Sequence, residues 1–212
     1  MHTTPATHFK YLSTSLPDSL PSLNVPALTE KDIRDLPFII GNADILGISF
    51  VHTPLDLKKL REEIERISGT NIAVVAKIET QDAVHQLARI ILEGLKFSSF
   101  GIMIARGDLA VEVGLENLPI VQEEILKIYS AAYIPVIWAT GVLEKLTKTG
   151  NPSRAEMTDA SCGKQAACIM LYKGPYIIES LKMLLYSSQL ITLRKRKLKW
   201  FSVKLLRNRI LL

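Results

Sequence analysis

The chain has 212 residues, 48% of them hydrophobic and 22% charged, which is the composition of an ordinary globular protein. No uninterrupted apolar run approaches the ~20 residues of a membrane-spanning helix, and the first residues lack the charged and then apolar segments of a secretory signal. Two cysteines are too few for a disulfide scaffold, so we expect reduced thiols and a cytoplasmic location.

The net charge of +5 is unevenly distributed along the chain. Residues 180–212 contain nine Lys or Arg and no Asp or Glu, so the rest of the chain carries a net charge of −4. We expect residues 191–212 to form a basic, solvated C-terminal tail. Contact with anionic surfaces is the alternative interpretation, but no fold typical of specific nucleic-acid binding accompanies the tail.

The first 27 residues are rich in Pro, Ser and Thr and show no helical period, so we expect an extended lead-in. A short helix should then begin after Thr29, with Asp32 completing its cap, and Pro37 should end or kink it. The folded domain is predicted to span residues 28–190.

Apolar runs recur about every 30 residues after this helix. They predict strands at 45–51, 72–78, 101–105, 135–139 and 167–171. Helices are predicted at 54–68, 80–92 and 118–131, and another from Ser153. This repeat is typical of parallel βαβ units, and strands that are apolar throughout indicate a sheet covered on both faces.

Two architectures have such a sheet, the open doubly wound fold and the closed barrel. No Gly-x-Gly-x-x-Gly follows the first strand, which weakens a dinucleotide-binding interpretation. Polar residues follow nearly every strand, as they do on the active-site face of a barrel: Ser49, His52, Lys77, Glu79, Arg106, Asp108, Thr140 and Lys173. We therefore predict an α/β fold, a partial (β/α)8 TIM barrel of about five parallel βα units.

Lys77 and Glu79 are two residues apart at a strand end, so their side chains should point to the same side. One interpretation is a structural ion pair. The other is an ammonium that stabilises a phosphate or oxyanion beside a metal-binding carboxylate. Asp108, from the next unit, would be a second carboxylate, and two carboxylates with waters and substrate oxygens suit Mg²⁺. Gly107 would let backbone N–H groups approach a substrate carboxylate.

Several segments, taken in order and spacing, resemble the pyruvate kinase family. They are residues 77–80 (KIET), 101–112 (GIMIARGDLAVE), Gln122, 135–140 (PVIWAT) and 153–156 (SRAE), with 26–32 (PALTEKD) and 49–51 (SFV) upstream. The resemblance covers residues ~20–175, most of the chain. It implies transfer of a phosphoryl group between phosphoenolpyruvate and ADP, as in glycolysis.

The resemblance also implies a role for each matching residue. Lys77 would stabilise the transferring phosphoryl group, and Glu79 and Asp108 would hold Mg²⁺ (or Mn²⁺). Backbone amides along Ala105, Arg106, Gly107 and Asp108 would bind the substrate carboxylate. Thr140 would lie near the carbon that is protonated when enolpyruvate becomes pyruvate. Such chemistry is mostly positioning and charge neutralisation, which a Lys and a divalent cation can supply.

The chain also departs from the family pattern. By the resemblance, its first strand is equivalent to the fourth barrel strand, so we expect the first three strands, the lid domain and most residues of the family's K⁺ site to be absent from it. Gly141-Val142 replaces the usual Gln-Met, and Ser153 replaces the usual Thr. Residues 172–175 replace the usual Ser-Gly-Glu-Thr. We expect no regulatory C-terminal domain after them.

We therefore expect the chain alone to show little or no pyruvate kinase activity, and a homo-oligomer or a complementing N-terminal half as its partner. Two alternatives remain at this point. One is a non-catalytic remnant or binding module. The other, which the resemblance disfavours, is a Mg²⁺-dependent lyase or aldolase on a similar barrel. We expect Trp138 to lie in the core. His52 follows a strand, and we favour a structural role for it, with a place in the site as the alternative.

Overall fold

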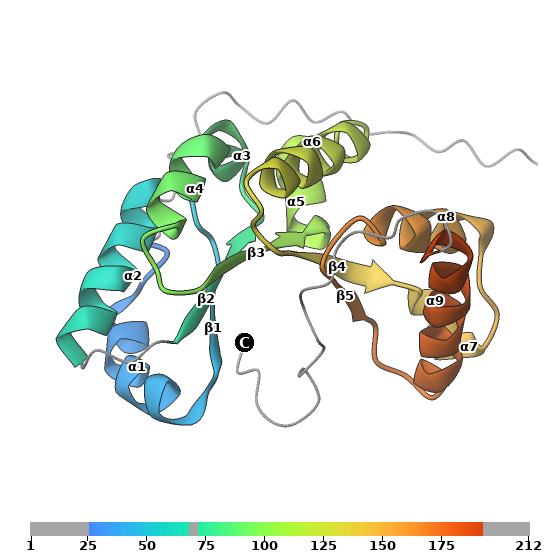
Figure 1. Cartoon of the computed structure of the whole chain (residues 1–212), viewed down its shortest axis with the longest axis horizontal. Helices are drawn as coiled ribbons and strands as arrows, with labels where there is room; N and C mark the ends of the chain where they lie inside the picture. The colour runs from blue at the N-terminus through green and yellow to red at the C-terminus, as the bar shows by residue number, and fades with distance from the viewer. Residues whose placement is uncertain (1–25, 68–71, 193–212) are drawn as a thin grey trace, which may run out of the picture.

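The computed structural model describes residues 26–67 and 72–192, except for the side chains of 187–192. Its centre is a five-stranded sheet in which all strands are parallel and pair in chain order (Figure 1). The strands are β1 (Ile45–Ile48), β2 (Ala73–Ile78), β3 (Phe100–Ala105), β4 (Val136–Val142) and β5 (Cys168–Leu171). The predicted fold class is confirmed, because the sheet and the helices between its strands form a partial α/β barrel.

Helices precede, connect and follow the strands. They are α1 (Glu30–Asn42), α2 (Pro54–Ile67), α3 (Gln81–His85), α4 (Leu87–Gly94), α5 (Arg106–Val113), α6 (Leu118–Ala131), α7 (Glu144–Thr149), α8 (Arg154–Gly163) and α9 (Ile177–Thr192). Within the described ranges, no helix is both long enough and apolar enough to cross a membrane.

One face of the sheet is covered by helices. Helix α2 packs against α4, and α4 packs against α6 (Figure 1). Burial alternates along β2, where Val74, Ala76 and Ile78 are buried while Val75 and Lys77 are half-buried. A period of two means that one row of side chains faces the helices and the other row faces the opposite side, which would be the interior of a closed barrel.

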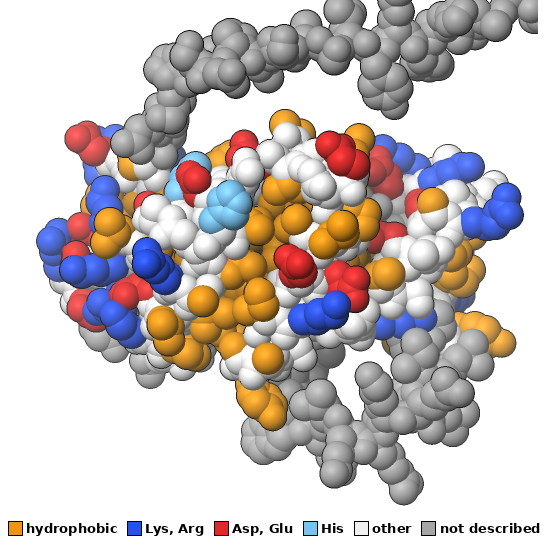
Figure 2. Space-filling view, turned by 90° about the horizontal axis from the view of Figure 1, so that it is seen from above, with side chains coloured by type: hydrophobic (Ala, Val, Ile, Leu, Met, Phe, Trp, Pro, Cys, Tyr) orange, Lys and Arg blue, Asp and Glu red, His pale blue; other side chains and the backbone are white. Residues whose placement is uncertain are grey.

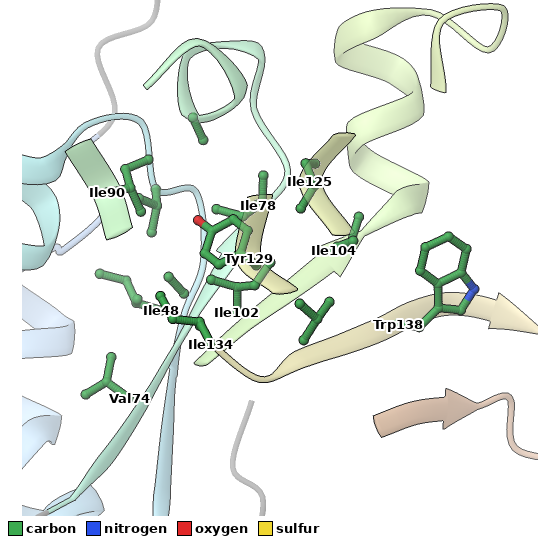
Figure 3. Packing of buried hydrophobic residues seen from close by; sticks show 14 of the residues in the cluster. Ile48, Val74, Ile78, Ile90, Ile102, Ile104, Ile125, Tyr129, Ile134 and Trp138 are labelled. Atoms are coloured by element: carbon green, nitrogen blue, oxygen red, sulfur yellow. The ribbon is translucent and has the colours of Figure 1, made fainter. Parts of the chain in front are cut away.

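The core lies between the sheet and these helices (Figure 3). The Tyr129 side chain of α6 is fully buried with Ile78 of β2 and Ile102 of β3. Burial raises the pKa of the Tyr129 phenol well above its ordinary value, so this hydroxyl stays protonated. Trp138 of β4 is also fully buried, and its predicted place in the core is confirmed.

Strand β4 is irregular near its carboxyl end. Its pairing with β5 runs from Ile137 and Trp138, shifts register, and resumes at Val142, as at a β-bulge. Trp138 and Val142 are fully buried, but Thr140, halfway between them, is exposed. In a regular strand these three side chains would share one face, so the bulge turns Thr140 away from the helix-facing row.

Two helices begin with the same capping arrangement, which was predicted for Thr29 and is also present at Ser153, where only the start of a helix was predicted. The Thr29 amide donates to Asp32 at 2.9 Å, and the Ser153 amide donates to Glu156 at 2.8 Å. In return, the hydroxyl of each cap residue accepts from the amide three residues on. These reciprocal bonds satisfy N–H groups that have no partner inside the helix, and so they fix where α1 and α8 begin.

Some expectations about these elements were wrong. Strand β1 ends at Ile48 and not at residue 51. Pro37 does not end helix α1, which continues through this exposed residue to Asn42 while the neighbouring Leu36 is buried in the core. The predicted helix 80–92 is two helices separated at Gln86, whose φ of −114° and ψ of 16° are not helical. Strand β4 ends at Val142 and not at residue 139, because the bulge lets pairing resume beyond Thr140.

Apolar side chains also reach the surface, and they gather across the middle of the face that Figure 2 shows. Helix α4 has both a buried and an exposed apolar side chain. Ile90 is fully buried, whereas Leu92 is 66% exposed. Isoleucine and leucine side chains have the same composition, so comparing their replacement in one helix shows the effect of burial on stability.

We predict that Ile90→Ala lowers the free energy of unfolding by about 2–5 kcal/mol, because it leaves a cavity in the core. Leu92→Ala should change this free energy by about 0.5 kcal/mol or less, because its side chain is mostly in water. Urea denaturation followed by circular dichroism measures both. Equal losses for the two variants would contradict the packing described for α4.

Candidate functional site at the carboxyl edge of the sheet

The Lys77 side chain is held at the end of β2 by two oxygen atoms. Its Nζ donates to Ser49 Oγ at 3.0 Å and lies 3.1 Å from Glu79 Oε2. The Lys77 side chain is only 20% exposed, and that of Glu79 is completely buried. The predicted Lys77–Glu79 neighbourhood is therefore confirmed as an ion pair, with Ser49 as a third member.

The other carboxylate oxygen of Glu79 is bound by the backbone. Glu79 Oε1 accepts a hydrogen bond of 2.6 Å from the amide of Phe50. Phe50 has a φ of 51°, in the left-handed region that few residues other than glycine adopt. Because a left-handed φ depends on tertiary context, no local pattern in the sequence pointed to this amide.

Glu79 Oε2 remains without a hydrogen bond although it is buried. It forms an ion pair with Lys77 Nζ at 3.1 Å, but the geometry of that contact is not that of a hydrogen bond. A buried carboxylate oxygen with no hydrogen-bond donor is costly, and it suits an atom that binds a cation.

The junction of β3 with α5 carries four of the predicted site residues. Ala105 is the N-cap of α5 and provides no side-chain cap, so the first amides of the helix have no partner from that side chain. Gly107 and Asp108 are exposed, whereas Ala105 and Arg106 are buried. Exposed first-turn amides with the positive end of the helix dipole favour an anionic group.

The Arg106 side chain is engaged with β4 and α8. Its Nε donates to the carbonyl of Ala139 at 2.9 Å, and Nη2 donates to the carbonyl of Thr140 at 2.7 Å. Both terminal nitrogens bind the Asp159 carboxylate, and the guanidinium carbon lies 4.4 Å from the centre of the Trp138 ring. Sequence reasoning missed Asp159, which follows the SRAE segment by three residues.

Thr140 lies beside Gly107. A Cβ atom placed on Gly107 would be 3.1 Å from Thr140 Oγ1, tighter than most contacts of real side chains. Glycine at this position therefore lets the threonine hydroxyl approach the first turn of α5. The structure brings together two predicted residues here, from the ends of neighbouring strands.

The strand register shows how the Lys77–Glu79 pair lies relative to Gly107 and Thr140. Ile78 pairs with Ile104 and Ala105 pairs with Ala139, so the ends of β2, β3 and β4 lie side by side. Among the residues the structure describes, no hydrogen bond or ion pair joins Lys77 and Glu79 to Gly107 and Thr140. The Nδ1 of His52, for which a place in the site was the less favoured alternative, is 3.1 Å from Asp82 Oδ2.

No cluster of three or more His, Cys, Asp or Glu occurs in the part of the chain that the structure describes. A metal held only by protein side chains is therefore not indicated there. Two carboxylates, Glu79 and Asp108, are what Mg²⁺ needs when water and substrate oxygens complete its octahedron. The buried Oε2 of Glu79, which pairs with the Lys77 ammonium but accepts no hydrogen bond, could take that role.

A cavity of about 430 Å³ adjoins the end of β4. Its lining residues are Gly141, Glu144, Lys145, Lys148, Thr149, Ser153 and Glu156. Glu156 joins two helices here, because its carboxylate accepts from the amide of Lys145 in α7 as well as from that of Ser153. Burial acts to raise the pKa of Glu156, but these amides and the Ser153 hydroxyl outweigh it, so the pKa lies below its ordinary value.

Comparison with known proteins gives consistent matches. The sequence model described as "Pyruvate kinase, barrel domain" matches residues 16–179. Pyruvate kinase of Mycobacterium intracellulare is 40% identical over 146 residues, which cover 68% of this chain and 30% of that protein. Pyruvate kinase of Methanocaldococcus jannaschii is 34% identical over 180 residues, 82% of this chain and 38% of that protein.

We predict that Glu156→Ala destabilises the fold by about 1 kcal/mol at pH 7, the usual cost of a lost helix cap. The pKa of Glu156 is lower in the folded state than its ordinary value of 4.5, so its stabilising contribution is present above about pH 4.5. This contribution is lost as the pH falls through the folded-state pKa, and the difference between wild type and variant should therefore shrink at lower pH.

Urea denaturation at a series of pH values measures that difference. Glu123→Gln is the control, because Glu123 forms only an exposed pair with Lys127. A difference that stays the same at pH 7 and at pH 3 would contradict this role for the Glu156 carboxylate.

Proposed function

The chain belongs to the pyruvate kinase family, and we propose that its strand ends supply part of a site that transfers a phosphoryl group from phosphoenolpyruvate to ADP. The chain spans about 30% of the length of several of these relatives. The proposal therefore concerns the contribution of these residues to a complete barrel. The lyase or aldolase alternative finds no support in the comparisons.

The observation that carries the proposal is the arrangement of Lys77, Ser49 and Glu79. The Lys77 ammonium is half-buried and held at 3.0 Å and 3.1 Å by two oxygen atoms. A positioned cation of this kind can neutralise charge on a transferring phosphoryl group. Phosphoryl transfer needs mainly such positioning and charge neutralisation.

Glu79 and Asp108 would hold the divalent cation, Mg²⁺ or Mn²⁺. When bound, the cation would neutralise charge on the carboxylate and enolate oxygens of the substrate. The support from this chain is the buried Oε2 of Glu79, which accepts no hydrogen bond, and the exposed Asp108 of the neighbouring unit.

The backbone amides of the β3–α5 junction would bind the substrate carboxylate, at residues Ala105, Arg106, Gly107 and Asp108. The Thr140 hydroxyl would lie near the carbon that is protonated when enolpyruvate becomes pyruvate. Support comes from the close approach of Thr140 to Gly107. A Cβ atom built on Gly107 would be 3.1 Å from Thr140 Oγ1. A carboxylate bound at Gly107 would therefore have the Thr140 hydroxyl as a neighbour.

One observation favours a second candidate, a binding module that keeps metal and substrate sites without turnover. A complete barrel has eight strands, whereas the described part of this chain has five. Within that part, β1 and β5 each pair on one side only. A site that needs groups from the other three strands would bind its ligands without completing phosphoryl transfer.

We predict that Mn²⁺ binds the chain more tightly when oxalate is present, because oxalate presents two adjacent oxygens as enolpyruvate does. Glu79→Gln and Asp108→Asn should each weaken Mn²⁺ binding at least tenfold, since each removes a charged ligand. Water proton relaxation measures the bound Mn²⁺. Glu112→Gln, on the same helix as Asp108, is the matched control, and equal losses in the control would contradict the proposed ligands.

We predict that the chain alone forms little or no ATP from phosphoenolpyruvate and ADP, because the five strands of the described residues do not close a barrel of eight. A coupled luciferase assay detects ATP above a reaction without protein. ATP formation by the wild type that disappears in Lys77→Ala would contradict this expectation. It would at the same time place Lys77 in the reaction and rule out the binding-module candidate.

A further inference from the structure

We propose that Asp159 is a positioning residue, which sets the distance between the first turn of α5 and Thr140 by fixing the Arg106 side chain. Its effect on substrate binding rests on the proposed function. Its effect on the distance does not, because that follows from the contacts of Arg106 alone.

Arg106 joins the ends of two strands. Its backbone is the first residue of α5, directly after β3, while its side chain donates to the carbonyls of Ala139 and Thr140 in β4. Any rotation of the guanidinium would therefore change how the β3–α5 junction sits against Thr140. The side chain is only 10% exposed, so these bonds are shielded from water.

Asp159 holds the guanidinium in the orientation that these bonds need. Both of its carboxylate oxygens accept from Arg106, one from each terminal nitrogen. A bidentate pair of this kind fixes the plane of the guanidinium as well as its position. With the two terminal nitrogens on Asp159, Nε and Nη2 also reach the two carbonyls of β4.

Helix α8 is well placed to act as a rigid support. Asp159 and Gly163 are one turn apart on α8, so they lie on the same face of the helix. A Cβ atom on Gly163 would stand 2.6 Å from Trp138 Cδ1, so the helix backbone comes very close to the indole. Trp138 in turn lies under the Arg106 guanidinium, 4.4 Å from ring centre to Cζ.

The contacts of helix α8, Trp138 and Arg106 form one connected network next to Thr140. Helix α8 touches Trp138 through Gly163 and Arg106 through Asp159, and Arg106 touches both Trp138 and the carbonyl of Thr140. The consequence falls on Thr140, whose Oγ1 lies beside Gly107. Asp159 thereby acts on the site through Arg106, without belonging to it.

The test compares three variants of the full chain by NMR. Asp159→Asn keeps the shape of the side chain and removes its charge. Asp159→Glu keeps the charge but adds a methylene, so it should displace the guanidinium less than the loss of charge does. Ser153→Ala is the control, because it weakens the N-terminus of α8 without touching Arg106.

The first measurement is the nuclear Overhauser effect between the α-protons of Gly107 and the side-chain protons of Thr140, without ligand. We expect it to fall at least twofold in Asp159→Asn, to fall less in Asp159→Glu, and to be unchanged in Ser153→Ala. An unchanged effect in folded Asp159→Asn would overturn the proposal. If Asp159→Asn does not fold, the same comparison is decided by Asp159→Glu.

The second measurement is the affinity for oxalate in the presence of Mg²⁺, by titration of the Gly107 amide resonance. We expect Asp159→Asn to weaken binding about tenfold and Ser153→Ala to leave it unchanged, at a temperature where all variants are folded. A changed distance with unchanged affinity would overturn the role in substrate positioning. Failure of the wild type to bind oxalate would count against the proposed function, and the first measurement would still decide the role of Asp159.

Discussion

Parallel pairing in chain order is the constraint on which the rest of this structure depends. It makes every strand end at the same edge of the sheet, so residues 30 positions apart in sequence become neighbours there. The helices between the strands have a second role, because they cover one face and leave the ends of the strands accessible. The pairing of the strands alone therefore brings the site residues at this edge together, without a long loop.

Much of this arrangement could be predicted from the sequence, because it depends on local pattern. Apolar runs, the Thr29 and Ser153 caps and the pair Lys77 and Glu79 are all visible within a few residues. The features that escaped prediction depend on contacts between distant segments. Phe50 adopts its left-handed φ where its amide donates to Glu79, a residue of another strand end. Asp159 binds Arg106, which lies 53 residues earlier in the sequence.

The two halves of the candidate site differ in how they are stabilised. Lys77 and Glu79 neutralise each other's charge, but one carboxylate oxygen stays without a hydrogen bond, which costs stability unless a ligand offsets it. The Arg106 guanidinium, by contrast, is bound by two carbonyls and one carboxylate. The first half is suited to receiving a cation, and the second to holding the backbone still.

The bulge in β4 has a consequence for how this sequence can change over time. The register shift takes up two extra residues, because four residue steps of β4, from Trp138 to Val142, lie opposite two steps of β5, from Ile169 to Leu171. Within this segment Thr140 is exposed while Trp138 and Val142 are buried. Substitutions around Thr140 can alter the chemistry of the hydroxyl and leave its direction intact. A one-residue deletion there would leave Trp138 and Val142 an odd number of residues apart, so a regular strand would turn one of these two buried side chains to the opposite face. Length is therefore under stricter constraint than composition in this segment.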